Sequence, residues 1–528
     1  MSKYIIVILT SILLATSCQS DESISSSAHL PNIIFILADD LGFGDVEVFN
    51  PQSKIRTPYL NKMAHEGMMF TDAHTSSSVC TPTRYGLLTG QYNWRSPLKK
   101  GVLFGRDSAL ITPTTTTVAH LLKKAHYQTA FIGKWHLGWD WALDDNNEID
   151  FTQPITAGPN ELGFDYAYGH IASLDIPPYV YVENRYVTTV PDSIIPATSG
   201  YEFYRKGWIA PDFHMEEVTP HFFKKSQAYI KEQSQTENPF FLYLALPSPH
   251  TPILPTPDWQ DQSGINPYAD FVMEIDHYVG DLMKCLDSLG ISDNTLVVFT
   301  SDNGCSPMAN FQELAAHGHH PSAWFRGHKA DIYEGGHRVP TVVKYPRLVE
   351  PGSTCDTTIC LTDFYSTFAD LARVTVPEDQ GADSYSLLSM WSDTSTSSFH
   401  REATIHSSIN GSFAIRKGAW KLNLCPGSGG WSDPRPQAAS DGDLPPVQLF
   451  HLTDDPGETN NIYAEHPGKV RELYDQLIHT IEQGRSTPGP PLKNAPDGYG
   501  NAWPARQKVK ELKPFIASLT RSADSDTQ

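Results

Sequence analysis

A cysteine stands four residues before an arginine in the segment Cys80-Thr81-Pro82-Thr83-Arg84. Proline is favoured in the first turn of a helix, because its missing N–H would have no helical partner there. The segment therefore predicts a helix that begins near Cys80 and carries Arg84 on the same face. The free N–H groups and the dipole at this end attract an oxyanion. We expect both side chains to face one anion; the alternative is a surface or capping cysteine at a helix start.

Polar residues also lie at the ends of four predicted buried strands. The carboxyl ends of parallel strands meet at one edge of a sheet, which is the usual position of a site in such folds. We therefore expect these residues to converge with Cys80. They are Asp39 and Asp40 after Asn32–Ala38, Lys134 and His136 after Gln128–Ile132, His250 after Phe240–Leu246, and Asp302 and Asn303 after Thr295–Thr300.

Two of these groups contain only oxygen donors: Asp39 with Asp40, and Asp302 with Asn303. Hard oxygen ligands favour Ca²⁺ or Mg²⁺ over Zn²⁺. Taken singly, each pair could equally cap a helix or form a turn. Their positions after two strands of one sheet favour a shared metal site.

The other two groups contain bases. Lys134 and His136 are two residues apart, so an extended chain would project them to the same side. A lysine neutralises oxyanions, and a histidine titrates where proton transfer is useful. His250 could bind the anion or protonate a leaving oxygen.

Together these motifs resemble those of the type I, formylglycine-dependent sulfatases, an arylsulfatase-like family that includes bacterial polysaccharide sulfatases. The resemblance rests on Cys-x-Pro-x-Arg followed by Leu-Leu-Thr-Gly, on Gly-Lys-Trp-His at 133–136, on Pro-His-Thr at 249–251, and on the segment 326–340, which contains Lys329. It implies that Cys80 is oxidised to formylglycine (3-oxoalanine) by a formylglycine-generating or an anaerobic sulfatase-maturating enzyme. It also implies Ca²⁺, held by Asp39, Asp40, Asp302, Asn303 and residue 80.

The resemblance further implies a mechanism. A hydroxyl of the hydrated aldehyde at position 80, polarised by the metal and Arg84, attacks sulfur in line with the leaving alcohol. Lys134, Lys329 and His250 stabilise the charge that develops. His136 then removes a proton from the second hydroxyl, which expels sulfate and regenerates the aldehyde.

Two other functions remain open at this point. Phosphatases, phosphodiesterases and phosphonate hydrolases of the related alkaline-phosphatase-like class usually carry two transition metals and a Thr or Ser nucleophile. The chain has no histidine-rich metal set at these positions, and it has Cys80, Pro82 and Arg84, so this class is disfavoured. A non-catalytic glycan-binding lipoprotein is disfavoured because every matched catalytic position is occupied.

The expected substrate is a sulfated carbohydrate. The segment 170–179 resembles a stretch in carbohydrate sulfatases of polysaccharide-degrading bacteria. We favour an algal polysaccharide such as ulvan or a galactan, with a host glycosaminoglycan as the alternative. Five further side chains could contact sugar or be structural: Asp175, His317, His319, His320 and His337.

The charge of the chain bears on its partners, and the N-terminal sequence bears on its location. Formal net charge is −21, from 39 basic and 60 acidic residues, which argues against a nucleic-acid partner. Lys3, an apolar stretch at 5–14 and small residues before Cys18 indicate a lipoprotein signal peptide at 1–17. Cys18 would then be lipidated, with 18–29 as a tether in the cell envelope, at the periplasm or outer membrane. The alternative is secretion after cleavage near Ser17.

The remaining chain predicts an α/β fold. Short apolar runs alternate with helical segments over 30–376, which indicates an alkaline-phosphatase-like sandwich with a large, mostly parallel sheet flanked by helices. A smaller domain with an antiparallel sheet is expected at 377–510, followed by a tail at 511–528; the chain beyond Pro488 is expected to be loosely ordered. The region 148–212 shows no clear period and is expected to form surface loops.

Setting aside Cys18 and Cys80, the other five of the seven cysteines are interpreted as structural.

Overall fold

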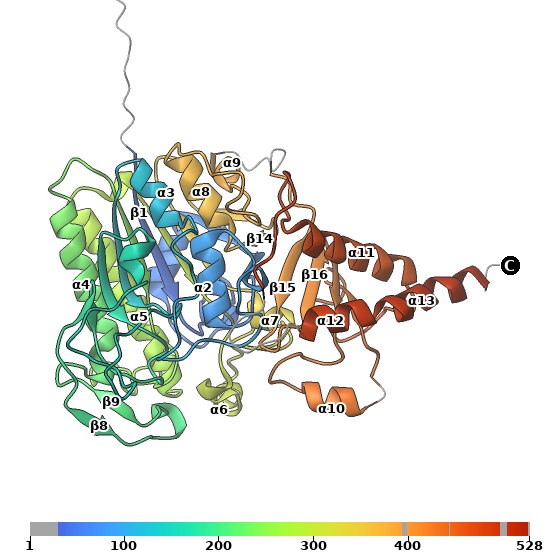
Figure 1. Ribbon diagram of the computed structural model, residues 1–528, viewed down its shortest axis with the longest axis horizontal. Coiled ribbons are helices and arrows are strands. Elements are labelled where there is room, and N and C mark those ends of the chain that lie inside the picture. Colours follow the sequence, from blue (N-terminus) through green and yellow to red (C-terminus); the bar gives the residue numbers. More distant parts are fainter. Residues whose placement is uncertain (1–29, 393–398, 443, 497–503, 526–528) are drawn as a thin grey trace, which may run out of the picture.

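Two β-sheets organise the protein in the computed structural model, which describes residues 30–392, 399–442, 444–496 and 504–525. A ten-stranded sheet lies in the larger part of the molecule, and a four-stranded sheet lies to one side of it (Figure 1). The chain passes from the first sheet to the second only after residue 392, so the strands of each sheet come from one continuous part of the sequence.

The middle of the large sheet is parallel, in the order β11-β1-β10-β4-β5. Antiparallel pairings extend it at both edges, so the whole sheet is mixed. The central strands are β1 (Asn32–Ala38), β4 (Gln128–Lys134), β5 (Tyr166–His170), β10 (Phe240–Ala245) and β11 (Thr295–Ser301). The edges are β12 (Thr341–Lys344), β2 (Met68–Phe70) and β13 (Ser353–Cys355) on one side, and β6 (Val182–Glu183) and β7 (Tyr186–Val187) on the other.

Helices cover both faces of this sheet, which explains why its central strands are apolar along their whole length. Every residue of β10 and β11 is buried. In one group of helices, α1 (Pro58–His65) and α4 (Val218–Gln233) both pack against α5 (Pro267–Ser288). The other is α2 (Cys80–Thr89), α3 (Val118–Lys124) and α8 (Asp363–Leu371).

The second sheet is antiparallel and has its own core. Helix α11 (Pro467–Gln483) buries Val470, Leu473 and Leu477 against it, at spacings that place them on one helix face. The strands are β15 (Thr404–Ser407), β16 (Phe413–Lys417), β17 (Trp420–Asn423) and β18 (Gln448–His451).

The fold class predicted from the sequence is confirmed, and the four strands predicted with bounds agree with the structure to within two residues. The predicted strand Asn32–Ala38 has the observed bounds of β1. Strands β10 and β11 each differ from the prediction by one residue at their ends, and β4 continues two residues further than expected, to Lys134. The boundary between 376 and 377 stays a prediction. Leu387, Met390 and Trp391 pack in the core of the large sheet, whereas Ile405 packs in the second core.

The prediction for the chain beyond Pro488 was wrong. Residues in this region form α12 (Pro504–Glu511) and α13 (Lys513–Ser525). Val509 and Ile516 are buried in the second core, and the hydroxyl of Tyr474 on α11 donates to the carbonyl of Val509 at 3.0 Å. These helices are ordered because they cover α11, a tertiary contact that tail composition does not reveal.

The prediction of surface loops over 148–212 was also wrong in part. The region supplies β5 to the large sheet, and a small two-stranded sheet of β8 (Ser193–Ile195) and β9 (Gly207–Ile209). Tyr168, Tyr179 and Tyr181 are buried in the main core. Large aromatic side chains, rather than a periodic apolar pattern, stabilise this part of the chain.

All six described cysteines are free and buried. The five that were interpreted as structural therefore pack as small apolar side chains, without disulfides among the described residues. Within the described ranges, no helix combines the length and the apolar character needed to cross a bilayer. The predicted signal peptide, Cys18 and the tether lie outside the described residues.

Candidate active site

The predicted convergence at the carboxyl edge of the sheet is present in the structure. Helix α2 begins at Cys80, whose side chain is buried, with Val79 extended before it. Donor atoms of Asp39, Cys80 and Asp302 all lie within 4.8 Å of one another, and so do donor atoms of Asp39, Asp40 and His250. Side chains that follow three different strands therefore surround the start of one helix.

Hydrogen bonds from the second sheet hold the loop before Cys80. The backbone N–H of Ser78 donates to the carbonyl of Ser407 on β15 at 3.0 Å, and the N–H of Ser407 donates to Ser76 at 3.1 Å. The N–H of Ala330 donates to Ser78 at 2.8 Å. The position of Cys80 thus depends on both sheets and on the segment that contains Lys329.

Arg84 is fully buried beneath this helix start. Its Nε and Nη2 donate to Oδ2 of Asp302 at 3.0 and 2.8 Å, and its Nη1 donates to the carbonyl of Lys134 at 2.7 Å. The guanidinium therefore orients Asp302 and the end of β4; that Arg84 and Cys80 face one anion stays a prediction.

The four predicted metal ligands form one buried cluster. Asn303 Nδ2 donates to Oδ1 of Asp40 at 2.7 Å, and Lys134 donates to Oδ2 of Asp39. Two oxygens in the cluster, Oδ1 of Asp39 and Oδ1 of Asn303, have no hydrogen-bond partner although they are buried. A buried polar atom without a partner costs free energy, so these two oxygens mark a place for a further group.

The electrostatics of the cluster show how crowded its charges are. Burial and the neighbouring Asp39 raise the pKa of Asp302 to about 7. Burial alone would also raise the pKa of Asp39, but Lys134, His250 and Arg84 hold it well below its ordinary value. The close cations therefore keep the carboxylate of Asp39 ionised, and this charge in turn raises the pKa of Asp302.

Lys329 reaches the cluster from a segment distant from Lys134 and contacts a different carboxylate. Its Nζ donates to Asp40 at 2.8 Å from Oδ2 and lies 2.6 Å from Oδ1. The side chain is buried, and its backbone N–H is fixed by the carbonyl of Cys305 at 3.0 Å. Two lysines from distant segments thus flank the two neighbouring carboxylates.

The side chain of His136 is buried, and its two ring nitrogens differ in their hydrogen bonding. Its Nε2 lies 2.9 Å from the carbonyl oxygen of Leu103, and a carbonyl only accepts, so Nε2 carries the proton. Nδ1 has no partner. Burial first, and then Lys134 and Arg84, lower the pKa of His136 well below its ordinary value.

The extended-chain argument for Lys134 and His136 does not apply. Lys134 is the last residue of β4, and His136 has a φ of 56°, so the strand geometry ends between them. The chain continues beside the next strand instead, because the N–H of Trp135 and of His136 donate to His170 and Ile171 at 3.0 and 2.8 Å.

His250 lies at the mouth of the cluster. Its Nε2 is 3.6 Å from Oδ2 of Asp40, and its Nδ1 is 2.8 Å from the carbonyl of Thr251. Its Nδ1 also lies 3.9 Å from Oδ1 of Asp175, and Arg205 donates to the other oxygen of this carboxylate. The sequence pattern did not single out Arg205, because a lone arginine in an aperiodic region carries no signal of its contacts.

A glycine permits this arrangement at the end of β4. Gly133 has a φ of 125°, and a Cβ there would lie 1.9 Å from the carbonyl oxygen of Ala245 on β10. Only glycine adopts this conformation without strain. Gly133 therefore sets the close approach of two strands that carry Lys134 and the segment of His250.

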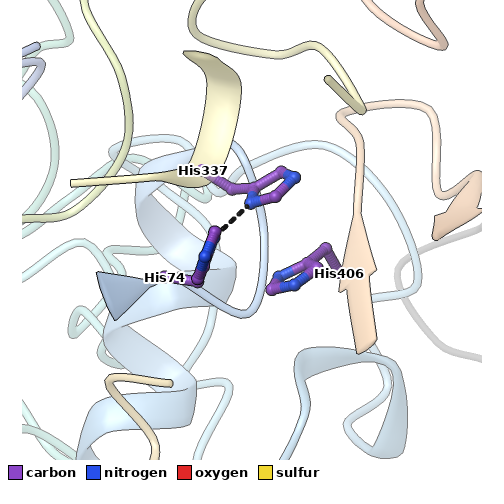
Figure 2. A group of neighbouring side chains, drawn as sticks. All are labelled: His74, His337 and His406. Carbon is purple, nitrogen blue, oxygen red and sulfur yellow. Dashed lines mark hydrogen bonds between the residues drawn. The ribbon is translucent and has the colours of Figure 1, made fainter. Parts of the chain in front are cut away.

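A separate group of histidines lies between the two sheets. Figure 2 shows His74, His337 and His406 pointing toward one another, with Nδ1 of His74 and of His337 3.0 Å apart. The rings of His337 and His406 stack at 4.0 Å. Burial lowers the pKa of all three, so they are neutral near pH 7.

Salt bridges surround these histidines and connect the sheets. Arg416 on β16 pairs with Asp72 at 2.7 Å, and Lys421 on β17 pairs with Glu334 at 3.0 Å and donates to His337 at 3.1 Å. His337 is therefore part of a structural network, not a sugar contact. His319 is likewise structural, since it is buried against Asp45 at 2.7 Å, while His317 and His320 are exposed.

Comparison with known proteins agrees with this geometry. Residues 31–374 match the family description "Sulfatase", and the chain belongs to this family. It is an enzyme, a sulfuric ester hydrolase. Family membership excludes the non-catalytic alternative and favours sulfate over phosphate esters.

Particular relatives refine this picture. The chain is 32% identical to an N-acetylgalactosamine-6-O-sulfatase of Bacteroides thetaiotaomicron, over 90% of this chain and 98% of that protein. A solved B. thetaiotaomicron sulfatase, from work on the metabolism of multiple glycosaminoglycans, superposes with a TM-score of 0.75 and 31% identity, over 85% of this chain and 99% of that one. A structure with bound neocarrahexaose shares the fold, at a TM-score of 0.66 and 22% identity over 91% and 97% of the two chains.

Proposed function

We propose that this sulfatase removes sulfate from a carbohydrate at the site around Cys80. The observation that carries the proposal is the meeting of Cys80 with three carboxylates and two lysines at one buried helix start. A sulfate ester is a tetrahedral anion, and lysines together with a helix N-terminus stabilise such a group.

The cluster fits a calcium ion. Asp39, Asp40, Asp302 and Asn303 would hold it, because all four offer hard oxygens and two of those oxygens are buried without partners. When bound, the ion would act as a Lewis acid toward sulfate oxygens. Burial first, and then repulsion from the close carboxylate of Asp39, raise the pKa of Asp302, and a bound cation would offset both effects.

The modification of Cys80 is the second part of the proposal. Burial raises the pKa of the Cys80 thiol, so an unmodified cysteine would be a thiol rather than a reactive thiolate. A formylglycine at this position would supply, as its hydrate, two hydroxyls in place of one sulfur. The first attacks the sulfur of the ester, and the second allows sulfate to leave without an external water molecule.

The surrounding side chains have distinct proposed roles. Lys134 and Lys329 neutralise charge on the sulfuryl oxygens, and Arg84 orients the site through Asp302. His250 donates a proton to the sugar oxygen when its bond to sulfur breaks. His136 accepts a proton at Nδ1 from the second hydroxyl, because this atom is the only ring nitrogen of His136 without a partner.

For the substrate we propose a sulfated galactose-type sugar. The names of the relatives support N-acetylgalactosamine 6-sulfate, a glycosaminoglycan component, as the first candidate. The sequence favours algal polysaccharides such as galactans and ulvan, and galactans share the sugar configuration.

Sulfate release from a panel of substrates tests the proposal. The panel contains N-acetylgalactosamine 6-sulfate, sulfated galactan oligosaccharides and ulvan oligosaccharides, and a phosphate monoester serves as a control. Release from at least one sulfated sugar, lost in Cys80→Ala, is the expected result. Hydrolysis of the phosphate ester alone would contradict the carbohydrate sulfatase assignment.

We further propose that the protein is exported and anchored through a lipid on Cys18. The support is the sequence of residues 1–18 alone. Fractionation of the host, with Cys18→Ala as the comparison, tests it: the wild type is expected with the membranes and the variant in the soluble envelope fraction. Equal distribution of both would contradict the anchor.

A further inference from the structure

A cleft beside the candidate active site has no role in the proposed reaction. We propose that it binds a neutral sugar residue adjoining the sulfated one, so that the enzyme acts on an oligosaccharide or polysaccharide. This inference rests on the proposed carbohydrate substrate and adds which neighbouring sugar the enzyme accepts.

The cleft has a volume of about 520 Å³, which is within the range of ligand sites. Its lining includes Phe151, Pro177, Pro178 and Trp208 on the apolar side, and Arg106 and Glu148 on the polar side. The side chain of Trp208 is 44% exposed, a large fraction for an indole. An exposed aromatic surface in a depression is typical of a binding site.

Short connections join the cleft to the active site along three segments. Pro177 is two residues from Asp175, Trp208 is three residues from Arg205, and Arg106 is two residues from Phe104. Arg205 links the other two of these neighbours. Arg205 donates to Asp175 and lies 5.8 Å from the ring centroid of Phe104.

Asp175 completes the path to the reaction centre. Its Oδ1 lies 3.9 Å from Nδ1 of His250. This oxygen has no hydrogen-bond partner, although the residue is buried and only 6% exposed. A sugar whose sulfate sits at Cys80 must leave past His250, the proposed proton donor. Asp175 can accept a hydroxyl of that sugar, and the next sugar in the chain would reach the cleft.

The cleft walls are preformed by close backbone packing. A Cβ at Gly105 would lie 1.8 Å from the carbonyl oxygen of Pro177, and a Cβ at Gly207 would lie 2.1 Å from Cβ of Pro177. The indole of Trp141 also donates to the carbonyl of Gly105 at 2.9 Å. Preformed walls reduce the entropy lost on binding.

The charges of the cleft favour a neutral occupant. Asp144 and Glu148 contribute two carboxylates, and Arg106 contributes one cation that already pairs with Glu148 at 2.8 Å. A second sulfate or a uronic acid would meet net negative charge there. A neutral pyranose would pack an apolar ring face on Trp208 and exchange hydroxyl hydrogen bonds with the polar side.

Two variants and matched substrates test the inference. The substrates are N-acetylgalactosamine 6-sulfate alone, the same residue linked to a neutral hexose, and the same residue linked to a uronic acid. For Trp208→Ala we expect kcat/KM on the neutral disaccharide to fall about tenfold, while that on the monosaccharide changes less than about twofold. The monosaccharide activity also shows that the variant is folded.

Glu148→Gln removes one carboxylate and frees Arg106. It is expected to raise kcat/KM on the uronic acid disaccharide by about fivefold, on the scale of one surface charge pair. Tyr186→Ala removes an aromatic side chain that is 57% exposed outside the cleft, and it should change none of the three activities.

The outcomes separate the two proposals. If the wild type releases sulfate from the monosaccharide but Trp208→Ala affects all substrates equally, the cleft assignment is overturned and the proposed function stands. If the wild type releases no sulfate from any of the three sugars, N-acetylgalactosamine 6-sulfate fails as the substrate and the cleft inference fails with it, whereas the carbohydrate sulfatase proposal is decided by the galactan and ulvan oligosaccharides of the wider panel.

Discussion

His136 and Thr81 hold the same residue from opposite sides: His136 Nε2 donates to the carbonyl of Leu103 at 2.9 Å, and the N–H of Leu103 donates to Thr81 Oγ1 at 3.2 Å. Thr81 directly follows Cys80 in α2. A single residue therefore links the orientation of the buried histidine to the first turn of the helix. The link also fixes which nitrogen of His136 is available as a base.

His136→Ala should lower kcat at least a hundredfold, because general base catalysis contributes about 10² to 10⁴ in rate. Since His136 is proposed to act when sulfate leaves, the variant should still consume one equivalent of substrate and then stall. A rapid-quench assay would detect a burst of released sugar without matching sulfate. Loss of the burst would contradict this role, and His317→Ala, at an exposed histidine, should behave as the wild type.

The state of residue 80 can be measured directly. Mass analysis of the peptide containing Cys80, from protein made in its native host, should show an aldehyde residue, in which oxygen has replaced sulfur and two hydrogens have been lost. Cys80→Ala should be inactive at the detection limit, because no nucleophile remains. Cys305→Ala is a control for the loss of a buried thiol nearby and should retain activity. An unmodified cysteine in active protein would falsify the formylglycine proposal.

The convergence of the site could be predicted because its signal is local. Asp39, Asp302 and His250 each follow a continuous apolar strand, and parallel strands bring their carboxyl ends together whatever the rest of the chain does. The sheet order was not needed for that inference. The partnership of Asp175 with Arg205 could not be found in this way, since it depends on how an aperiodic segment folds back.

The tail helices show a signal that was present but weak. Val509, Leu512, Ile516 and Leu519 recur at spacings of three, four and three residues, which is a helical stripe. Short helices are marginal without a packing partner. Here the packing partner is α11. The sequence alone could not show that the tail helices cover one side of α11.

Calcium should stabilise the folded protein through Asp39. Binding to the native state alone adds about 2.7 kcal/mol when the ion is at a hundred times its Kd. Differential scanning fluorimetry of chelated protein should therefore show a rise in Tm on adding Ca²⁺. Asp39→Asn keeps the shape but removes a charged ligand, and should abolish most of the rise, whereas the exposed Asp258→Asn should not. An equal rise in the Tm of both variants would mean that the ion binds at another site.

The histidine cluster between the sheets should make stability depend on pH. Burial lowers the pKa of His406, so the folded protein keeps it neutral while the unfolded chain binds a proton below about pH 6.5. The unfolded state then binds more protons, and folding stability falls as the pH falls, by about 1.4 kcal/mol per pH unit for each such histidine. Above pH 6.5 the penalty is absent, because His406 is neutral in both states.

His406→Asn isolates this effect from that of other titrating groups. Near pH 7.5 the variant should be less stable than the wild type by about 1 to 3 kcal/mol, because the ring that stacks on His337 and donates to Thr75 at 2.8 Å is lost. Toward pH 5.5 only the wild type loses stability by keeping residue 406 unprotonated. The difference in the free energy of unfolding between the wild type and the variant should therefore narrow. Denaturant unfolding at the two pH values measures this change. A constant difference would mean that His406 has the same pKa in the folded and the unfolded protein, and a difference that widens toward pH 5.5 would mean that the folded protein binds the proton more tightly; either result would contradict this prediction.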